Sequence, residues 1–266
     1  MTNSNLKMES RSRMQINKIE IIDCIEGMKK LENDSVHISI TSPPYNVGNS
    51  VRGNLYNEYE DSLTPEQYKK FIYSVIDELI RVTKHYVFFN FQILSNNKNV
   101  YLDMLSDYKH NIKDTIIWHK KQVQPSIDQH ILNSAFEFII VFSKKEFCEK
   151  RSFERCFFDN RKKGQLNNNV IYGNNSANER FNGRNEHGAI FPIYLVKEIL
   201  KRFSQENDII LDPFMGTGTT AVASRQLNRN YIGFEINERY YNIAQQRLSQ
   251  KNINEMFAQQ NIKDIF

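Results

Sequence analysis

The chain has 266 residues, 40% hydrophobic and 25% charged, so it can bury a core and global disorder is excluded. Its length suits one large α/β domain, and a net charge of +4 is compatible with a polyanionic partner without establishing one. No apolar run is long enough to span a membrane, and three cysteines without metal-knuckle spacing are typical of a reduced, cytoplasmic protein.

The first 142 residues alternate apolar runs with helical patterns. After a polar lead-in, the pattern predicts a strand, a helical piece, a second strand, a polar loop, a long helix and three more strands: 19–22, 25–31, 36–40, 47–62, 64–80, 85–91, 112–119 and 137–142. The second strand runs into TSPPYN, where neither proline can donate a ladder hydrogen bond. Thr64 and Pro65 are typical of the start of a helix.

Residues 143–186 differ in composition, being rich in Asn, Lys and Arg with few apolar positions, which predicts an insertion with little core of its own. Regular patterns then return. They predict a helix from 191–192 onward, a strand, the loop DPFMGTGTT, a helix, a strand and a last helix: 208–211, 212–220, 221–227, 230–234 and 240–248.

The glycine loop is the first candidate site. Gly216 and Gly218 follow a strand and precede a helix, where glycine permits a tight turn and close approach of a ligand to the backbone. Glu235 ends the next strand, where an acid can accept hydrogen bonds from two ribose hydroxyls. Asp212 would repel a pyrophosphate but suits a positively charged amino or sulfonium group. The loop therefore favours S-adenosylmethionine over NAD, and a helix-capping turn without a ligand is the alternative.

The second candidate site is the tetrapeptide Ser42-Pro43-Pro44-Tyr45. Its rigid prolines fix the direction of two backbone carbonyls, which can accept hydrogen bonds from an amino group and push electron density onto its nitrogen. The ring of Tyr45 suits stacking on a flat base. The alternative is a Pro-Pro turn that carries an exposed tyrosine.

The order TSPPYN before DPFMGTGTT resembles the β group of DNA amino-methyltransferases, a restriction-modification family whose members act on cytosine N4 or adenine N6. The resemblance runs from about residue 19 to 248 and includes IIDCIEGMKKL, HGAIFP and YIGFEIN. It implies a methyltransferase (Rossmann-like) α/β fold with a mixed, mostly parallel sheet flanked by helices. The two motifs then meet at the carboxyl ends of neighbouring strands. The implied organisation is a flexible segment, a catalytic half, a target-recognition region and a cofactor-binding half: 1–18, 19–142, 143–186 and 187–266.

The resemblance also assigns roles to residues of the first motif. Ser42, Pro43, Pro44 and Tyr45 match the family's catalytic motif. The Ser42 side chain and the Pro43 carbonyl would contact the target amine, and Tyr45 would stack on the flipped-out base. The base must leave the double helix, because an enclosed site cannot reach an amine inside the duplex. The methyl group moves in line from S-adenosylmethionine without a covalent intermediate or a metal, and positioning supplies most of the acceleration.

The positions that match the family's cofactor site surround the methyl donor. Asp212, Phe214, Gly216 and Gly218 match the loop, Glu235 the ribose-binding acid, Asp23 a position near adenine, and His187, Phe191 and Pro192 an element over the methionine end. For His187 a helix-start residue, and for Phe191 core packing, are the alternatives.

Ser42 favours cytosine N4 over adenine N6, because adenine members of the group often carry Asp here and a carboxylate is the stronger acceptor. The 143–186 region would contact double-stranded DNA, with Lys and Arg on phosphates and Asn, Gln or Arg on base edges. A solvated loop is the alternative. The resemblance implies a cognate restriction endonuclease as partner, and the sequence leaves a homodimer open.

Three other readings compete with DNA methylation. The same chemistry could act on RNA or on a protein glutamine, but the glutamine enzymes use an Asn-Pro-Pro-Tyr motif. A nicotinamide oxidoreductase is disfavoured by the charge of Asp212. A catalytically silent DNA-binding module has no support, because all four positions of the catalytic motif are intact.

Overall fold

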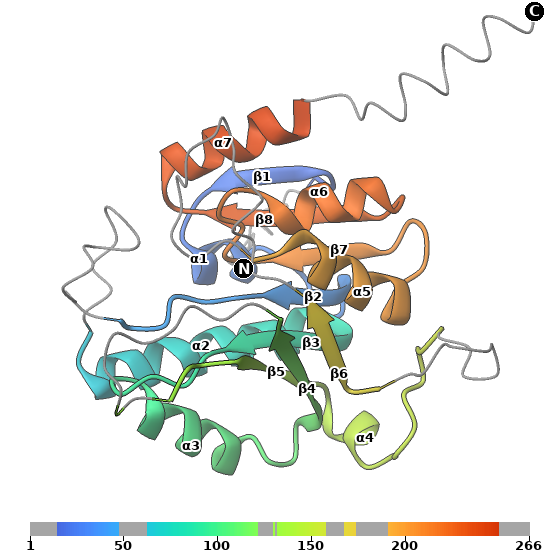
Figure 1. Ribbon diagram of the computed structural model, residues 1–266. Helices are drawn as coiled ribbons and strands as arrows, with labels where there is room; N and C mark the ends of the chain where they lie inside the picture. The colour runs from blue at the N-terminus through green and yellow to red at the C-terminus, as the bar shows by residue number, and fades with distance from the viewer. Residues whose placement is uncertain are drawn as a thin grey trace, which may run out of the picture.

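The computed structural model describes residues 15–47, 63–121, 130, 132–157, 168–173 and 191–249. These residues build one sheet with strand order β1-β8-β7-β2-β3-β5-β4-β6 (Figure 1). The strands are β1 (Lys18–Ile21), β2 (Val36–Thr41), β3 (Thr83–Phe91), β4 (Ile112–Lys120), β5 (Phe136–Phe142), β6 (Val170–Gly173), β7 (Ile209–Asp212) and β8 (Asn230–Glu235). Only β5 runs antiparallel to its neighbours. The predicted mixed, mostly parallel sheet is therefore confirmed.

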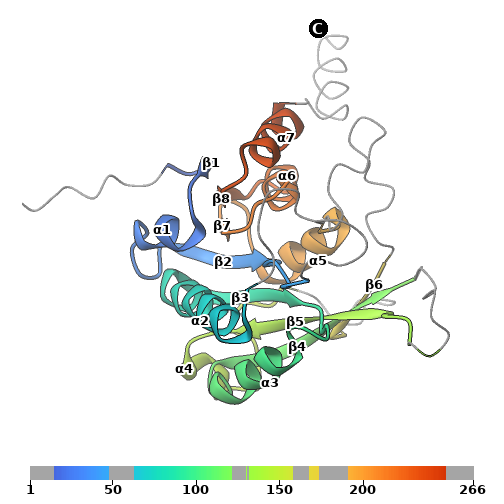
Figure 2. The same ribbon diagram turned by 90° about the vertical axis from the view of Figure 1, so that its left-hand side faces the viewer.

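Helices cover both faces of the sheet (Figure 2). They are α1 (Cys24–Lys29), α2 (Pro65–Val82), α3 (Lys98–Asp107), α4 (Lys145–Cys148), α5 (Ile193–Phe203), α6 (Thr219–Gln226) and α7 (Glu238–Ser249). One apolar core joins α1, α2 and α3 to the sheet, and a second joins α5 to the opposite face. In the part of the chain described here, no helix is both long and apolar enough to cross a membrane.

The local signals at element ends proved reliable. Thr64 caps α2 by accepting a hydrogen bond from the Gln67 backbone N–H at 3.3 Å, and the Gln67 side chain accepts from the Thr64 N–H at 3.1 Å. This reciprocal pair satisfies two N–H groups that the first turn leaves without helical partners. The predicted strands and helices are all present, whereas α3 and the four-residue β6 had no strong periodic signal.

Parts of the predicted 143–186 region belong to the main domain. Phe153 and Cys156 pack against the core on the α5 face, and β6 pairs with β4. The rest of the region, 158–167 and 174–186, lies outside the described residues, as do 1–14, 187–190 and most of the polar loop predicted at 47–62. The lead-in predicted to end at 18 is ordered slightly earlier, because the Asn17 N–H donates to the Tyr231 carbonyl at 2.6 Å beside β1.

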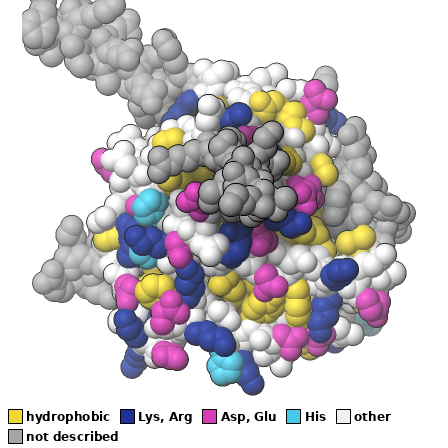
Figure 3. All heavy atoms as spheres, turned by 180° about the vertical axis from the view of Figure 1, so that it is seen from behind, with side chains coloured by type: hydrophobic (Ala, Val, Ile, Leu, Met, Phe, Trp, Pro, Cys, Tyr) yellow, Lys and Arg dark blue, Asp and Glu magenta, His cyan; other side chains and the backbone are white. Residues whose placement is uncertain are grey.

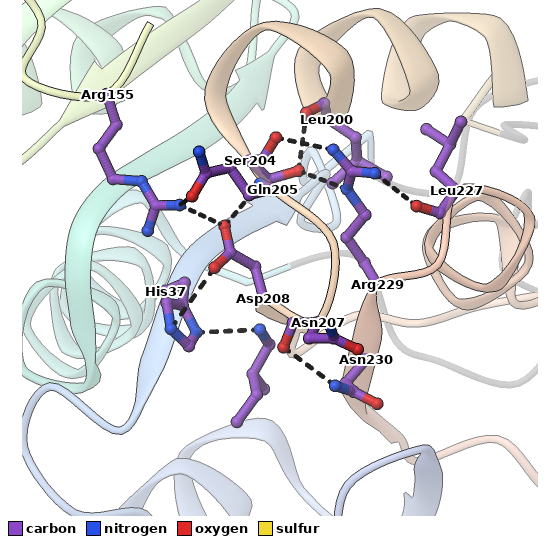
Figure 4. A network of polar contacts seen from close by, with 11 residues as sticks. His37, Arg155, Leu200, Ser204, Gln205, Asn207, Asp208, Leu227, Arg229 and Asn230 are labelled. Carbon is purple, nitrogen blue, oxygen red and sulfur yellow. Dashed lines mark hydrogen bonds and ion pairs between the residues drawn. The ribbon is translucent and has the colours of Figure 1, made fainter. Parts of the chain in front are cut away.

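A polar network ties together the amino ends of the central strands (Figure 4). Asp208, just before β7, accepts hydrogen bonds at 2.8 Å from the Arg155 guanidinium and from the Gln205 backbone N–H. Its other carboxylate oxygen lies 3.5 Å from Nε2 of His37, whose Nδ1 accepts from the Ile209 N–H at 2.9 Å. The network fixes where β2 and β7 begin.

We predict that this end of the sheet makes the fold sensitive to acid. Burial lowers the pKa of His37, and burial together with the nearby Arg155 charge lowers the pKa of His85 from 6.5 to about 4. A histidine with a lowered folded-state pKa contributes stability that is complete above pH 6.5 and is lost as the pH falls toward 4. Both histidines should therefore add a falling slope to the free energy of unfolding, measured in urea, as the pH drops, and the raised pKa of Asp212 opposes this slope.

The His85→Phe variant should flatten that slope, because it removes one of the two groups that take up protons on unfolding. His110→Phe, at an exposed position, is the control and should keep the wild-type slope. An unchanged slope in His85→Phe would contradict the assignment.

Candidate active site and cofactor loop

The two sequence motifs leave the sheet side by side. β2 pairs with β7 in parallel, with Ile38 opposite Ile210 and Ser39 opposite Leu211. The Thr41 hydroxyl at the end of β2 donates to Oδ1 of Asp212 at the end of β7, at 2.8 Å across 171 positions of sequence. The expectation that the motifs meet at neighbouring carboxyl ends is confirmed.

Asp212 lies at the centre of this junction. Oδ1 of its buried carboxylate also accepts from the Phe214 N–H at 3.0 Å, and Oδ2 accepts from the Thr220 hydroxyl at 2.6 Å. Burial raises the pKa of Asp212 to about 6, although the three donors oppose this shift. The sequence assigned Asp212 a cofactor role, and the structure adds that it joins the strand end, the glycine loop and the first turn of α6.

The two glycines of the loop have different surroundings. Both have positive φ, 52° at Gly216 and 84° at Gly218. A Cβ on Gly218 would lie 2.7 Å from Cβ of Ala244 on α7, so this glycine allows the loop to pack. Among the described residues, a Cβ on Gly216 would meet nothing closer than the Phe214 carbonyl at 3.9 Å. Gly216 therefore borders open space, as a close-approach position for a ligand requires.

Glu235 closes the other side of the loop. Its Oε2 accepts from the Gly216 N–H at 2.7 Å and its Oε1 from the Asn237 N–H at 2.8 Å. Burial raises the pKa of Glu235. A carboxylate has about four acceptor positions, so these two bonds leave capacity for ligand hydroxyls.

Apolar side chains and a second acid continue this edge. Ile236 follows Glu235 and is 57% exposed, and Ile21, opposite Glu235 in the β1–β8 register, is 50% exposed. Asp23 caps α1 by accepting from the Ile25 N–H at 2.9 Å. Sequence reasoning missed Ile236, because an isoleucine after a strand does not reveal that it is exposed.

The segment before α5 reaches the same edge of the sheet. Since α5 leads into β7, its first turn lies near the carboxyl ends of the strands. Pro192 is buried and its carbonyl accepts from the Leu195 N–H at 3.1 Å. Phe191 packs, partly buried, against the core around α5, as its alternative reading expected. Phe214 packs edge-on against Phe71 of α2, and His187 lies outside the described residues.

The catalytic motif is held by its backbone. Tyr68 of α2 donates its hydroxyl to the Pro44 carbonyl at 2.9 Å, and Asn97 donates to the Tyr45 carbonyl at 2.9 Å. Asn46 has a φ of 56° and is joined to Leu63 by two hydrogen bonds of 2.8 and 2.9 Å. The motif is therefore anchored to α2 and to the segment before α3.

Tyr45 is buried rather than exposed, with 7% of its surface accessible. Its ring lies 5.8 Å from that of Phe91, and its hydroxyl lies 2.9 Å from Oγ of Ser42. The hydroxyl also contacts Asn90 of β3 at 2.6 Å and Glu137 of β5 at 3.0 Å. The simple alternative of a Pro-Pro turn with an exposed tyrosine is therefore wrong.

Three residues beside the motif were not identified from the sequence: Asn90, Glu137 and Lys120. The Lys120 ammonium lies 2.6 Å from Oε1 of Glu137. The sequence did carry a signal for two of them, because Asn90 and Glu137 are polar residues within the otherwise strongly apolar strands HYVFFNF and EFIIVF. Their meeting depends on strand pairing between β3, β5 and β4.

Comparison with known proteins decides the family. A family model for N6/N4 methyltransferases, described as DNA methylase, matches residues 36–246. The chain belongs to this family. The match includes both motifs and the strands that carry them.

Curated relatives and solved structures agree with this membership. The chain is 27% identical over 274 residues to the type II methyltransferase M1.MboII of Moraxella bovis, covering 91% of this chain and 100% of the relative. It is 26% identical over 247 residues to M.HinfI of Haemophilus influenzae, covering 85% of this chain and 66% of the relative. The cytosine-N4-specific PvuII DNA methyltransferase shares the fold, with a TM-score of 0.69, 18% identity and coverage of 93% and 90%.

The protein is thus a DNA amino-methyltransferase with S-adenosylmethionine as its cofactor. The residues present fit that cofactor. Open space borders Gly216, acids lie at Asp212 and Glu235, and an exposed isoleucine follows Glu235. Anionic side chains suit the positive charges of this cofactor.

We predict that substitution of the two loop glycines affects different properties, cofactor binding at Gly216 and stability at Gly218. Gly216→Ala should cost only about 1–2 kcal/mol of stability, the price of its positive φ, but weaken S-adenosylmethionine binding at least about tenfold, because its methyl group fills the open space. Gly218→Ala adds the overlap with Ala244 and should destabilise the fold further.

Urea unfolding and titration calorimetry measure the two effects separately. Wild-type cofactor affinity in Gly216→Ala would show that the ligand does not approach the loop at this point.

Proposed function

We propose that this protein methylates the N4 amino group of cytosine in double-stranded DNA, as the modification enzyme of a restriction-modification system. Ser42 is the observation that carries the choice of base. It stands at the end of β2, with its hydroxyl 2.9 Å from that of Tyr45 and its strand bonded to the glycine loop through Thr41. In the β group of DNA amino-methyltransferases, which the sequence resembles, the adenine enzymes often carry Asp at this position.

The proposed reaction depends mainly on positioning. The target cytosine turns out of the duplex, because its amine is otherwise hidden. Oγ of Ser42 and the Pro43 carbonyl accept hydrogen bonds from the amine, which directs the nitrogen lone pair toward the donor. When bound, S-adenosylmethionine supplies an electrophilic methyl group. The anchored backbone of the motif limits the motion of these acceptors.

Each cofactor position has a proposed task. Glu235 accepts the ribose hydroxyls with its remaining lone pairs, and Ile236 with Asp23 borders the adenine. Asp212 already accepts three hydrogen bonds, so we assign it a role through its charge and through the loop that it holds. Phe191, Pro192 and His187 remain proposed for the methionine end.

Side chains at the same edge could contact DNA. Phe136 and Tyr172 are 45% and 59% exposed, and strand pairing aligns both with His119 between them. Exposed rings at this edge suit stacking on bases. On the face seen in Figure 3, Lys and Arg are interspersed with Asp and Glu, so we place the phosphate contacts in the basic 143–186 region instead.

Relatives support a partner and a second candidate substrate. M1.MboII and M.HinfI are named type II methyltransferases, which supports a cognate endonuclease acting on the same site. Adenine N6 is the second candidate. A relative in Escherichia coli, 27% identical over 244 residues and covering 85% of this chain and 80% of the relative, is named DNA adenine methyltransferase YhdJ.

Expression in a methylation-free bacterial host, followed by mass spectrometry of DNA nucleosides, tests the proposal. We expect a new N4-methylcytosine peak, because Ser42 favours this base. The Ser42→Ala/Tyr45→Ala variant is the control and should lose the peak, because it removes both hydroxyls at the strand end.

An N6-methyladenine peak would overturn the base assignment and keep the enzyme class. No methylated nucleoside, from protein that binds S-adenosylmethionine, would contradict the proposed DNA substrate.

A further inference from the structure

A buried carboxylate lies two hydrogen bonds away from the proposed acceptor Ser42. The Tyr45 hydroxyl donates to Oε2 of Glu137 at 3.0 Å, and the same hydroxyl oxygen lies 2.9 Å from Oγ of Ser42. These residues come from the catalytic motif and from the start of β5, which runs antiparallel to β3. The path is therefore a feature of the tertiary structure and not of the motif alone.

Counting protons fixes the direction of this path. An ionised carboxylate only accepts hydrogen bonds, so the one hydroxyl proton of Tyr45 must point to Glu137. The contact between Ser42 and Tyr45 then has a single possible donor, the Ser42 hydroxyl. With its proton directed at Tyr45, Ser42 presents oxygen lone pairs to anything else that approaches.

Asn90 supports the same direction. Its Nδ2 donates at 2.6 Å to Glu137 and at 2.6 Å to Tyr45, and lies 3.4 Å from Oγ of Ser42. The opposite amide orientation would put two acceptor oxygens 2.6 Å apart. Oδ1 of Asn90 is buried without a partner among the described residues, which costs about 1–3 kcal/mol. The fold tolerates this loss while the two amide protons are directed at Glu137 and Tyr45.

Lys120 forms a buried ion pair with Glu137. The ammonium and the carboxylate are 2.6 Å apart, with side chains only 10% and 8% exposed. Breaking such a buried pair leaves an uncompensated charge, so the pair holds the Glu137 carboxylate in place beside Tyr45. The ammonium also lies 5.2 Å from the centre of the Trp118 ring, which limits its freedom.

We propose that Glu137, held by Lys120, is a positioning residue that orients the Tyr45 and Ser42 hydroxyls so that Ser42 accepts a hydrogen bond from the target amine. This inference rests on the proposed role of Ser42. It accounts for a serine at the position where adenine members of the resembled group often carry Asp, because the negative charge of Glu137 acts through two hydroxyls. It holds whichever base is methylated.

The Glu137→Gln variant should remove the fixed direction of the path. Lys120 requires an oxygen on its side, so the new amide nitrogen faces Tyr45 and Asn90. The Tyr45 hydroxyl then has no carboxylate to accept its proton, and the Ser42 hydroxyl is no longer held with its lone pairs toward the substrate. We expect kcat to fall about tenfold or more, the effect of roughly one lost hydrogen bond, with the S-adenosylmethionine affinity and the KM for DNA nearly unchanged.

A double-mutant cycle with Tyr45→Phe tests whether Glu137 acts through the Tyr45 hydroxyl. The assay measures transfer of labelled methyl groups from S-adenosylmethionine to unmethylated genomic DNA of the expression host. Tyr45→Phe should itself lower kcat, and adding Glu137→Gln should then change kcat less than about threefold. Asp103→Asn is the control and should match wild type, because Asp103 forms a similar 2.7 Å pair with Lys69 at the surface.

Wild-type kcat in Glu137→Gln, or an equal loss with and without the Tyr45 hydroxyl, would overturn the proposal. If Glu137→Gln does not fold, a second double-mutant cycle combines Tyr45→Phe with Ser42→Ala. If the Tyr45 hydroxyl acts through Ser42, Tyr45→Phe should not lower kcat further in the Ser42→Ala background. Mass spectrometry of the same wild-type reactions identifies the base. A different base would overturn the proposed function and leave the cycle intact.

Discussion

A buried carboxylate, that of Asp212, connects the two sequence motifs of this enzyme. Asp212 is almost inaccessible to solvent, and burying a carboxylate is expensive unless hydrogen bonds compensate. Thr41, Thr220 and the Phe214 N–H provide that compensation, but the raised pKa of about 6 shows that it is incomplete. These hydrogen bonds fix the position of the strand end that carries Ser42 relative to the glycine loop.

The parallel sheet makes this relation possible. β8, β7, β2 and β3 present their carboxyl ends at one edge, and the antiparallel β5 contributes its amino end there. Glu235, Asp212, the catalytic motif and Glu137 consequently lie along one line of the sheet. The opposite edge carries the network around Asp208, which fixes the strand starts. The candidate site therefore lies at the carboxyl ends of the strands, and the contacts that fix the strand starts lie at their amino ends.

Local patterns were sufficient to predict both motifs and most elements, but not α3, α4 or β6. Prolines that end β2, glycines after β7 and the cap at Thr64 act over a few residues, so the sequence displays them directly. The contacts that complete the site are not local. Glu137 meets Tyr45 only because β5 reverses beside β3, and Lys120 joins them through the β4–β5 register. Burial of Tyr45 and exposure of Ile236 depend on the assembled sheet and could not be predicted from composition.

The Thr41→Val variant tests most directly whether the Asp212 junction couples the two motifs. The substitution keeps the shape of the side chain but removes one donor to a buried carboxylate, at a cost of about 1–3 kcal/mol. We predict that S-adenosylmethionine affinity and kcat fall together, each about tenfold, while Thr115→Val on β4 changes neither. Wild-type cofactor binding and wild-type methyl transfer in Thr41→Val would contradict the account.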